Sequence, residues 1–176
     1  MRCATASMVK ASIDDGIARH GMVDHPAYGR VYAYEVDGAG ERLLMDDANM
    51  PSLLSMPMTG FAAADDPAYL ATRKLLLSPE NPYYYSGSAG AGIGSPHTPP
   101  SHVWPIALAV QGLTSTSADE RQQLLELLRD TTGGTGQMHE SFHTDDPTIY
   151  TREWFSWANA MFCELALAHA GRRLPD

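Results

Sequence analysis

Apolar residues recur at helical spacing along six stretches of the chain, which predicts six helices. The first runs from about Thr5 to His20, and Gly21 follows it as a C-terminal stop. The fifth follows Ser117, a good N-cap residue, and has acids in its first turn. The five helices after the first are expected over residues 50–58, 67–77, 102–113, 118–128 and 151–170.

A second pattern, with a period of two, covers residues 30–47, where β-branched and aromatic residues flank Asp37 and Gly38. This alternation predicts one small β-hairpin. The fold class is therefore all-α, built of helical hairpins with one β-hairpin, and at this length a single domain is expected.

The last predicted helix carries too many large apolar residues for one narrow stripe. We therefore expect it to be buried over much of its circumference, with Cys163 in the core. Trp104, Trp154 and Trp157 are also expected in the core because of their helical spacing.

Composition narrows the class of partner. The chain is 44% hydrophobic and 19% charged with a mean hydropathy of -0.25, which is typical of a globular protein and predicts no membrane span. Its net charge of -9 argues against nucleic acid or an anionic membrane as partner. The two cysteines suggest no disulfide framework, and no signal peptide is visible, so a cytoplasmic location is expected.

Residues 139–143 read HESFH, the His-Glu-x-x-His spacing by which one helix face offers two imidazoles to zinc. Glu164 follows about twenty residues later, roughly where one class of zinc protease places its third ligand. However, three glycines within residues 133–136 and a proline within residues 145–147 leave little room for the helix that this motif needs. A zinc metalloprotease stays as an alternative function.

The same segment belongs to a set of loops that suits a carbohydrate. Sugar-cleaving sites need carboxyl groups flanking the bond, aromatic faces, and polar side chains for the hydroxyls. The long loops over residues 78–101 and 131–150 supply such residues, and Asp46, Asp47 and Asn49 stand just before a predicted helix. One of these three is expected to be an N-cap, which leaves the others for a ligand.

Three segments, LLMDDANMPSLLSMP, ENPYYYSGSAGAGIGSPHTPPSHVWPIALAVQGLTS and GGTGQMHESFHTDDPTIYTREWFSWANAMFCEL, resemble in this order the C-terminal half of glycoside hydrolase family 125. These enzymes are metal-independent exo-α-1,6-mannosidases. The resemblance implies an (α/α)6 barrel that removes terminal α-1,6-linked mannose with inversion and without metal or cofactor. It also implies that Glu140 is the general base, a role that requires an ionised carboxylate beside water.

The expected partners are α-1,6-linked mannosides or N-glycan fragments. The candidate residues for binding the sugar are Asp46, Asp47, Asn49, Ser95, His97, Thr98, His139 and Arg152. A non-catalytic mannoside-binding module is a further alternative, and it would bind sugar without turnover.

The resemblance also implies that something is missing. Family members are more than twice as long, and the aspartate that acts as their general acid lies upstream of the segment that matches residue 1. Asp14 and Asp15 match a plain helical region and are expected to be solvated surface acids. Residues 1–176 are thus expected to be the C-terminal portion of one catalytic domain, about half of the barrel, whose partner is the missing N-terminal half.

Overall fold

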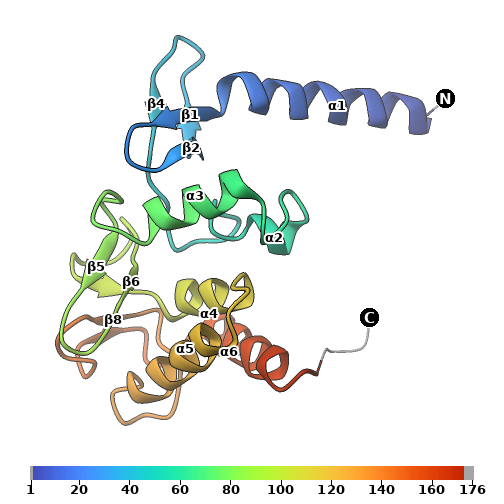
Figure 1. Ribbon diagram of the computed structural model, residues 1–176. Helices are drawn as coiled ribbons and strands as arrows, with labels where there is room; N and C mark the ends of the chain where they lie inside the picture. Colours follow the sequence, from blue (N-terminus) through green and yellow to red (C-terminus); the bar gives the residue numbers. More distant parts are fainter. Residues whose placement is uncertain (1, 173–176) are drawn as a thin grey trace.

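The computed structural model describes residues 2–172, which contain six helices and nine short strands (Figure 1). The helices are α1 (Arg2–His20), α2 (Met56–Thr59), α3 (Pro67–Leu76), α4 (Pro105–Leu113), α5 (Ala118–Asp130) and α6 (Ser156–His169). The strands are β1 (Met22–His25), β2 (Gly29–Tyr32), β3 (Glu35–Val36), β4 (Arg42–Leu43), β5 (Tyr84–Ser86), β6 (Ala91–Ile93), β7 (His102–Val103), β8 (Ser141–His143) and β9 (Tyr150–Thr151).

The strands form four small antiparallel sheets within the described residues: β1-β2, β3-β4, β5-β6 and the three-stranded β7-β8-β9. The β3-β4 pair confirms the hairpin predicted around Asp37. The expectation of a single hairpin was wrong, because strands of two to four residues are too short to show a period of two in the sequence.

The helix predictions hold best where caps mark the ends. Asp66 accepts a hydrogen bond from the backbone N–H of Tyr69 at 2.8 Å at the start of α3. Ser117 accepts one from the N–H of Glu120 at 3.2 Å at the start of α5, which confirms the predicted N-cap. Both side chains satisfy a donor that has no partner within its helix.

The core is centred on α4, which is buried along most of its length and packs against α5 and α6 in the lower half of Figure 1. Gly112 allows α4 to approach α6 closely, because a Cβ at this position would meet Leu165 Cδ1 at 2.6 Å. Leu165 itself is completely buried. The β7-β8-β9 sheet adds Phe142, also completely buried, to the same cluster.

A second layer joins α3 to the first sheet. The backbone N–H of Tyr32 donates to Thr72 Oγ1 at 2.9 Å, and the hydroxyl of the buried Tyr69 donates to the carbonyl of Leu54 at 2.9 Å. These bonds fix α3 between β2 and the loop that precedes α2.

The first helix extends away from the rest of the chain (Figure 1); it contacts β1, and the carbonyls of Ala18 and His20 near its C-terminal end accept hydrogen bonds from Arg30 and Arg42. Val9 and Ile13 are 54% and 56% exposed. Asp14 and Asp15 form exposed ion pairs with Lys10 and Arg19, so they are surface acids, as expected.

Three expected helices differ from the structure. The helix expected over residues 102–113 begins at Pro105, because His102 and Val103 form β7 and pair with β8. Residues 50–58 contribute only α2, since the chain before Met56 is held in turns by side-chain bonds and carries Pro51. The last helix begins at Ser156 rather than near 151, because Tyr150 and Thr151 pair with β8.

The expected burial of the last helix was also wrong. Its buried residues among those described are Ala158, Met161 and Leu165, while Cys163 is exposed. Trp104 lies in the core, as predicted, but Trp154 and Trp157 are 70% and 38% exposed.

The described chain is mostly helical with small hairpins, and its helices do not close a barrel. None of the helices in residues 2–172 is both long and apolar enough to span a membrane.

Candidate active site

The HESFH segment is extended rather than helical. Its last three residues form β8, and the backbone N–H of Glu140 donates to the carbonyl of Thr151 at 3.1 Å. An extended segment lacks the 3.6-residue period that brings the two histidines of a zinc motif onto one face. Within residues 2–172 no three His, Cys, Asp or Glu side chains gather as a set of metal ligands.

His139 is a buried support for this strand, with 1% of its surface exposed. Its Nδ1 lies 2.6 Å from the carbonyl oxygen of Glu153, and its Nε2 lies 2.9 Å from that of Thr132. The ring stacks on Tyr150 with 3.8 Å between centroids. Both nitrogens and one face are therefore used within the protein, so the structure does not place His139 on an open sugar-binding surface.

Glu140 lies between the buried residues His139 and Ser141. Its Oε1 lies 3.1 Å from Arg152 Nε, and the two side chains are 15% and 67% exposed, respectively. The guanidinium also lies 5.8 Å from the ring centroid of Phe155. The structure thus holds a carboxylate directly before β8, charge-paired yet still partly open to water, an arrangement compatible with a general base.

Arg152 has an uncommon backbone conformation, with a φ of 46°. Residues other than glycine rarely adopt positive φ, and such strain clusters at functional sites. Just before it, Ser141 Oγ and Thr151 Oγ1 are hydrogen-bonded at 2.7 Å across the β8-β9 pair. Together these contacts fix the position of Arg152 relative to Glu140.

Asp46, one of the three polar residues before α2, is completely buried. Its carboxylate accepts hydrogen bonds from the backbone N–H groups of Leu53 at 3.0 Å and Leu54 at 2.9 Å. Burial is the largest influence on this group and raises its pKa to about 7, against the opposing effect of these N–H donors. Asp46 therefore organises the loop, and its carboxylate is not presented to a ligand.

Asp47 and Asn49 form a polar cluster with Ser95. Asp47 Oδ1 accepts from the backbone N–H of Asn49 at 3.1 Å and from its Nδ2 at 3.0 Å. The same Nδ2 lies 3.3 Å from Ser95 Oγ, and the N–H of His97 donates to that oxygen at 3.2 Å. The structure therefore brings these four candidates together from two loops that are distant in sequence.

Thr98 connects this polar cluster to the aromatic core. Its hydroxyl oxygen accepts from Trp104 Nε1 at 2.8 Å, and Trp104 meets Phe155 edge to face at 6.1 Å. Phe155 in turn lies beneath Arg152. A continuous set of contacts thus runs from the cluster around Ser95 to the pair formed by Arg152 and Glu140.

Two neighbours of the site were not identified from the sequence. Burial and the negative charges of Asp47 and Asp46 raise the pKa of Tyr34, which places this phenol near the carboxylates. Asn81 Oδ1 accepts from the backbone N–H of Asp46 at 3.3 Å. In the sequence, Tyr34 was marked only by its place in the alternating pattern of the predicted hairpin. No sequence feature indicated that Asn81 lies near the site.

These features agree with comparisons to known proteins. A solved structure of a Streptococcus pneumoniae metal-independent α-mannosidase, in a non-productive complex with α-1,6-mannobiose, is 50% identical with a TM-score of 0.93. It matches 97% of this chain but only 40% of its own. The similarity places the chain among the glycoside hydrolases.

The family assignment is more specific. The model of the metal-independent α-mannosidases, glycoside hydrolase family 125, matches residues 2–167, so the chain belongs to this family. The meiotically up-regulated gene 157 protein of Schizosaccharomyces pombe is 54% identical over 164 residues, which cover 93% of this chain and 32% of that protein. The chain therefore spans about a third of this curated relative.

Proposed function

We propose that this chain is the C-terminal portion of an inverting exo-α-1,6-mannosidase and that Glu140 is its general base. The observation that carries the proposal is the position of Glu140, a mostly buried carboxylate paired with Arg152 at 3.1 Å. In an inverting reaction, such a group takes a proton from the water that attacks the sugar opposite the leaving group. The leaving oxygen needs a separate acid, supplied by the rest of the catalytic domain.

The cluster of Asp47, Asn49, Ser95 and His97 is our proposed mannose-binding surface. Its accessible members, Asn49 and His97, offer amide and imidazole groups to a sugar, while Asp47 and Ser95 are 7% and 1% exposed and hold Asn49 in place. Arg152 acts mainly on Glu140, and Asp46 and His139 hold the loops that carry the site. The α-1,6-mannobiose bound to the S. pneumoniae enzyme supports a substrate of this linkage.

The test is a chimera in which this chain replaces the matched segment of the S. pneumoniae α-mannosidase. We expect it to hydrolyse α-1,6-mannobiose with a chelator present and to release β-mannose first, as proton NMR detects. Glu140→Gln removes the charge without changing the shape, so we expect at least a 100-fold loss of kcat, the scale typical of general-base catalysis.

Glu164→Gln is the matched control, since it removes the same charge from an exposed position on α6. This variant should retain full activity. Undiminished hydrolysis by Glu140→Gln, or loss of activity with chelator or with Glu164→Gln, would contradict the metal-free mechanism with Glu140 as base. Mannobiose binding without turnover in a folded chimera would instead indicate a non-catalytic binding module.

A further inference from the structure

The glycine-rich hairpin of β5 and β6 connects two parts of the candidate site. Its second strand leads directly into Gly94 and Ser95, and Ser95 belongs to the polar cluster. The carbonyl of Gly94 also accepts a hydrogen bond from the backbone N–H of Ala48 at 3.1 Å. Ala48 lies between Asp47 and Asn49, which belong to the same cluster. At its turn, the hairpin contacts the residues that follow β8, the strand that begins directly after the proposed base.

One carboxylate holds the turn of this hairpin against the end of β8. Asp145 Oδ1 accepts hydrogen bonds from the backbone N–H of Ser88 at 2.7 Å and from its hydroxyl at 3.2 Å. The carbonyl of Thr144 accepts from the N–H groups of Ala89 at 2.7 Å and Gly90 at 3.2 Å. The Ser88 N–H lowers the pKa of Asp145, because a hydrogen bond to the ionised carboxylate stabilises that form. We name these contacts the Asp145 clasp.

Glycines bring the hairpin into direct contact with the sheet of the proposed base. A Cβ on Gly87 would collide with Asp145 Oδ1, and a Cβ on Gly94 would collide with the carbonyl oxygen of His102. His102 pairs with His143 where β7 lies beside β8. Glycine allows such close approach because it has no side chain. The hairpin therefore rests on the β7-β8 pair at both of its ends.

From these contacts we propose that Asp145 is a positioning residue, whose clasp sets the distance between the polar cluster and the carboxylate of Glu140. The inference rests on the proposed function, because it takes Glu140 as the base and the cluster as the sugar-binding surface. The water that Glu140 activates must reach the sugar that the cluster holds. A misplacement of about 1 Å, even by a change far from the reacting atoms, costs about 100-fold in rate.

The first test uses the chimera with the S. pneumoniae enzyme. Asp145→Ala removes the side-chain acceptor of the clasp, so we expect kcat for α-1,6-mannobiose to fall about 10-fold while KM changes by no more than about 2-fold. Asp145→Asn keeps an oxygen acceptor and should restore most of the lost kcat. Gly87→Ala disturbs the clasp from the opposite side, since its Cβ would press on Asp145 and on the Thr144 carbonyl, and it should lower kcat to a similar extent.

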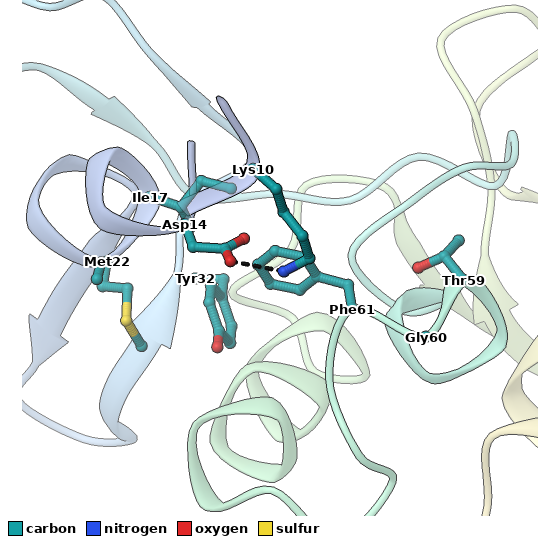
Figure 2. Close-up of a pocket in the computed structure, with 9 residues that line it drawn as sticks. Lys10, Asp14, Ile17, Met22, Tyr32, Thr59, Gly60 and Phe61 are labelled. Atoms are coloured by element: carbon teal, nitrogen blue, oxygen red, sulfur yellow. Dashed lines mark hydrogen bonds and ion pairs between the residues drawn. The ribbon is translucent and has the colours of Figure 1, made fainter. Parts of the chain in front are cut away.

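Two other acids serve as controls. Asp146 is also exposed, but its Oδ1 accepts from the N–H and the hydroxyl of Thr148 within its own turn. Asp14 pairs with Lys10 at the cavity beside α1, which Figure 2 shows and which includes no residue of the clasp or of the polar cluster. Asp146→Ala and Asp14→Ala should therefore keep the kcat and KM of the original chimera. A loss of kcat in either control equal to that of Asp145→Ala would overturn the proposal.

A merely structural role for Asp145 gives a different result. Because Asp145 is exposed, Asp145→Ala should leave the urea midpoint of unfolding nearly unchanged while kcat falls. A lower midpoint with an unchanged kcat would overturn the positioning role. A loss of kcat that Asp145→Asn fails to restore would overturn it as well.

Hydrogen exchange on this chain alone tests the clasp without any turnover. In Asp145→Ala we expect faster exchange at the N–H groups of Ala89 and Gly90, which belong to the clasp. We also expect faster exchange at the N–H of Ala48, which bonds to the far end of the hairpin. Asp146→Ala should change none of these rates. Faster exchange confined to Ala89 and Gly90 would show that the clasp does not fix the polar cluster, and it would overturn the proposal even if the chimera were inactive.

The proposed function and the clasp fail in different ways. If Glu140→Gln kept full hydrolysis, the proposed base would be wrong, while the exchange rate at Ala48 would still decide whether the clasp fixes the polar cluster. If Glu140→Gln lost hydrolysis and Asp145→Ala did not, Glu140 would stand as the base and the positioning role of Asp145 would be refuted.

Discussion

Replacing Asp46 tests how much the loop before α2 depends on one buried carboxylate. Asp46→Ala leaves the backbone N–H groups of Leu53 and Leu54 without their acceptors, which lie 3.0 and 2.9 Å away. Because Asp46 is completely buried, water cannot replace these bonds. An unsatisfied buried donor costs about 1–3 kcal/mol, so we expect a loss of about 2–6 kcal/mol in the free energy of unfolding. Asp46→Asn keeps one acceptor and should cost about half as much.

The assay is urea denaturation of the chain followed by circular dichroism, with Asp37→Ala as the control. Asp37 Oδ1 accepts from three backbone N–H groups, those of Ala39, Gly40 and Glu41, but on an exposed turn. If burial sets the cost, Asp37→Ala should destabilise the chain less than Asp46→Ala, despite its additional bond. The reverse order would refute the reasoning.

The pH dependence of stability provides a second measurement on the same residue. Burial raises the pKa of Asp46 from its ordinary 3.8 to about 7. Between pH 3.8 and about 7, Asp46 keeps its proton in the folded chain and releases it in the unfolded chain. The stability that this protonation contributes is therefore complete below pH 3.8 and is lost as pH rises through about 7. The difference of about 3 pH units corresponds to at most about 4 kcal/mol. Asp46→Asn should remove this pH-dependent part of the free energy of unfolding. If the variant and the original chain had the same pH profile of unfolding, the prediction would be contradicted.

Three further predictions concern the site and its support. In the chimera, Arg152→Gln should lower kcat by roughly 2- to 5-fold, because this factor corresponds to the free energy typical of an exposed ion pair. An unchanged kcat would argue against pairing with Glu140. Trp104→Phe removes the 2.8 Å bond to Thr98 and should raise KM for mannobiose about 2- to 10-fold with kcat nearly constant, so a change confined to kcat would contradict it. Gly112→Val should lower the free energy of unfolding in urea by about 1–3 kcal/mol through collision with Leu165, and undiminished stability would show that the contact can relax.

The sequence predicted those helices whose ends are marked by local chemistry. Asp66 and Ser117 cap α3 and α5 within one turn, so both starting points could be read from neighbouring residues. The region before Met56 could not be predicted in this way. Its turns depend on the carboxylate of Asp46 and on Ser55 Oγ, which accepts from the N–H of Ser52 at 2.8 Å. These bonds compete with a helix that the apolar spacing alone would favour.

In the candidate site, too, some features could be predicted from the sequence and others depend on contacts that only the folded chain makes. The role of Glu140 as general base stays a prediction from the resemblance, and its neighbours Arg152 and Thr151 come from a segment ten or more residues away. The role of His139 could not be predicted, because the two backbone carbonyl oxygens beside its ring nitrogens, those of Thr132 and Glu153, are brought to it only by the folded loop. Sequence spacing indicates which side chains are available, but not which backbone groups will use them.

The extended conformation of HESFH explains why its residues have opposite tasks. Glu140 lies at a bend directly before β8, between His139 and Ser141. His139 and Ser141 are buried and hydrogen-bonded, and they therefore hold the backbone on either side of Glu140. A carboxylate fixed in this way and paired with Arg152 has its orientation set by the strand and by one guanidinium. In a zinc motif both histidines would face the same ligand as the glutamate; here His139 is buried, with its ring nitrogens beside two backbone carbonyls.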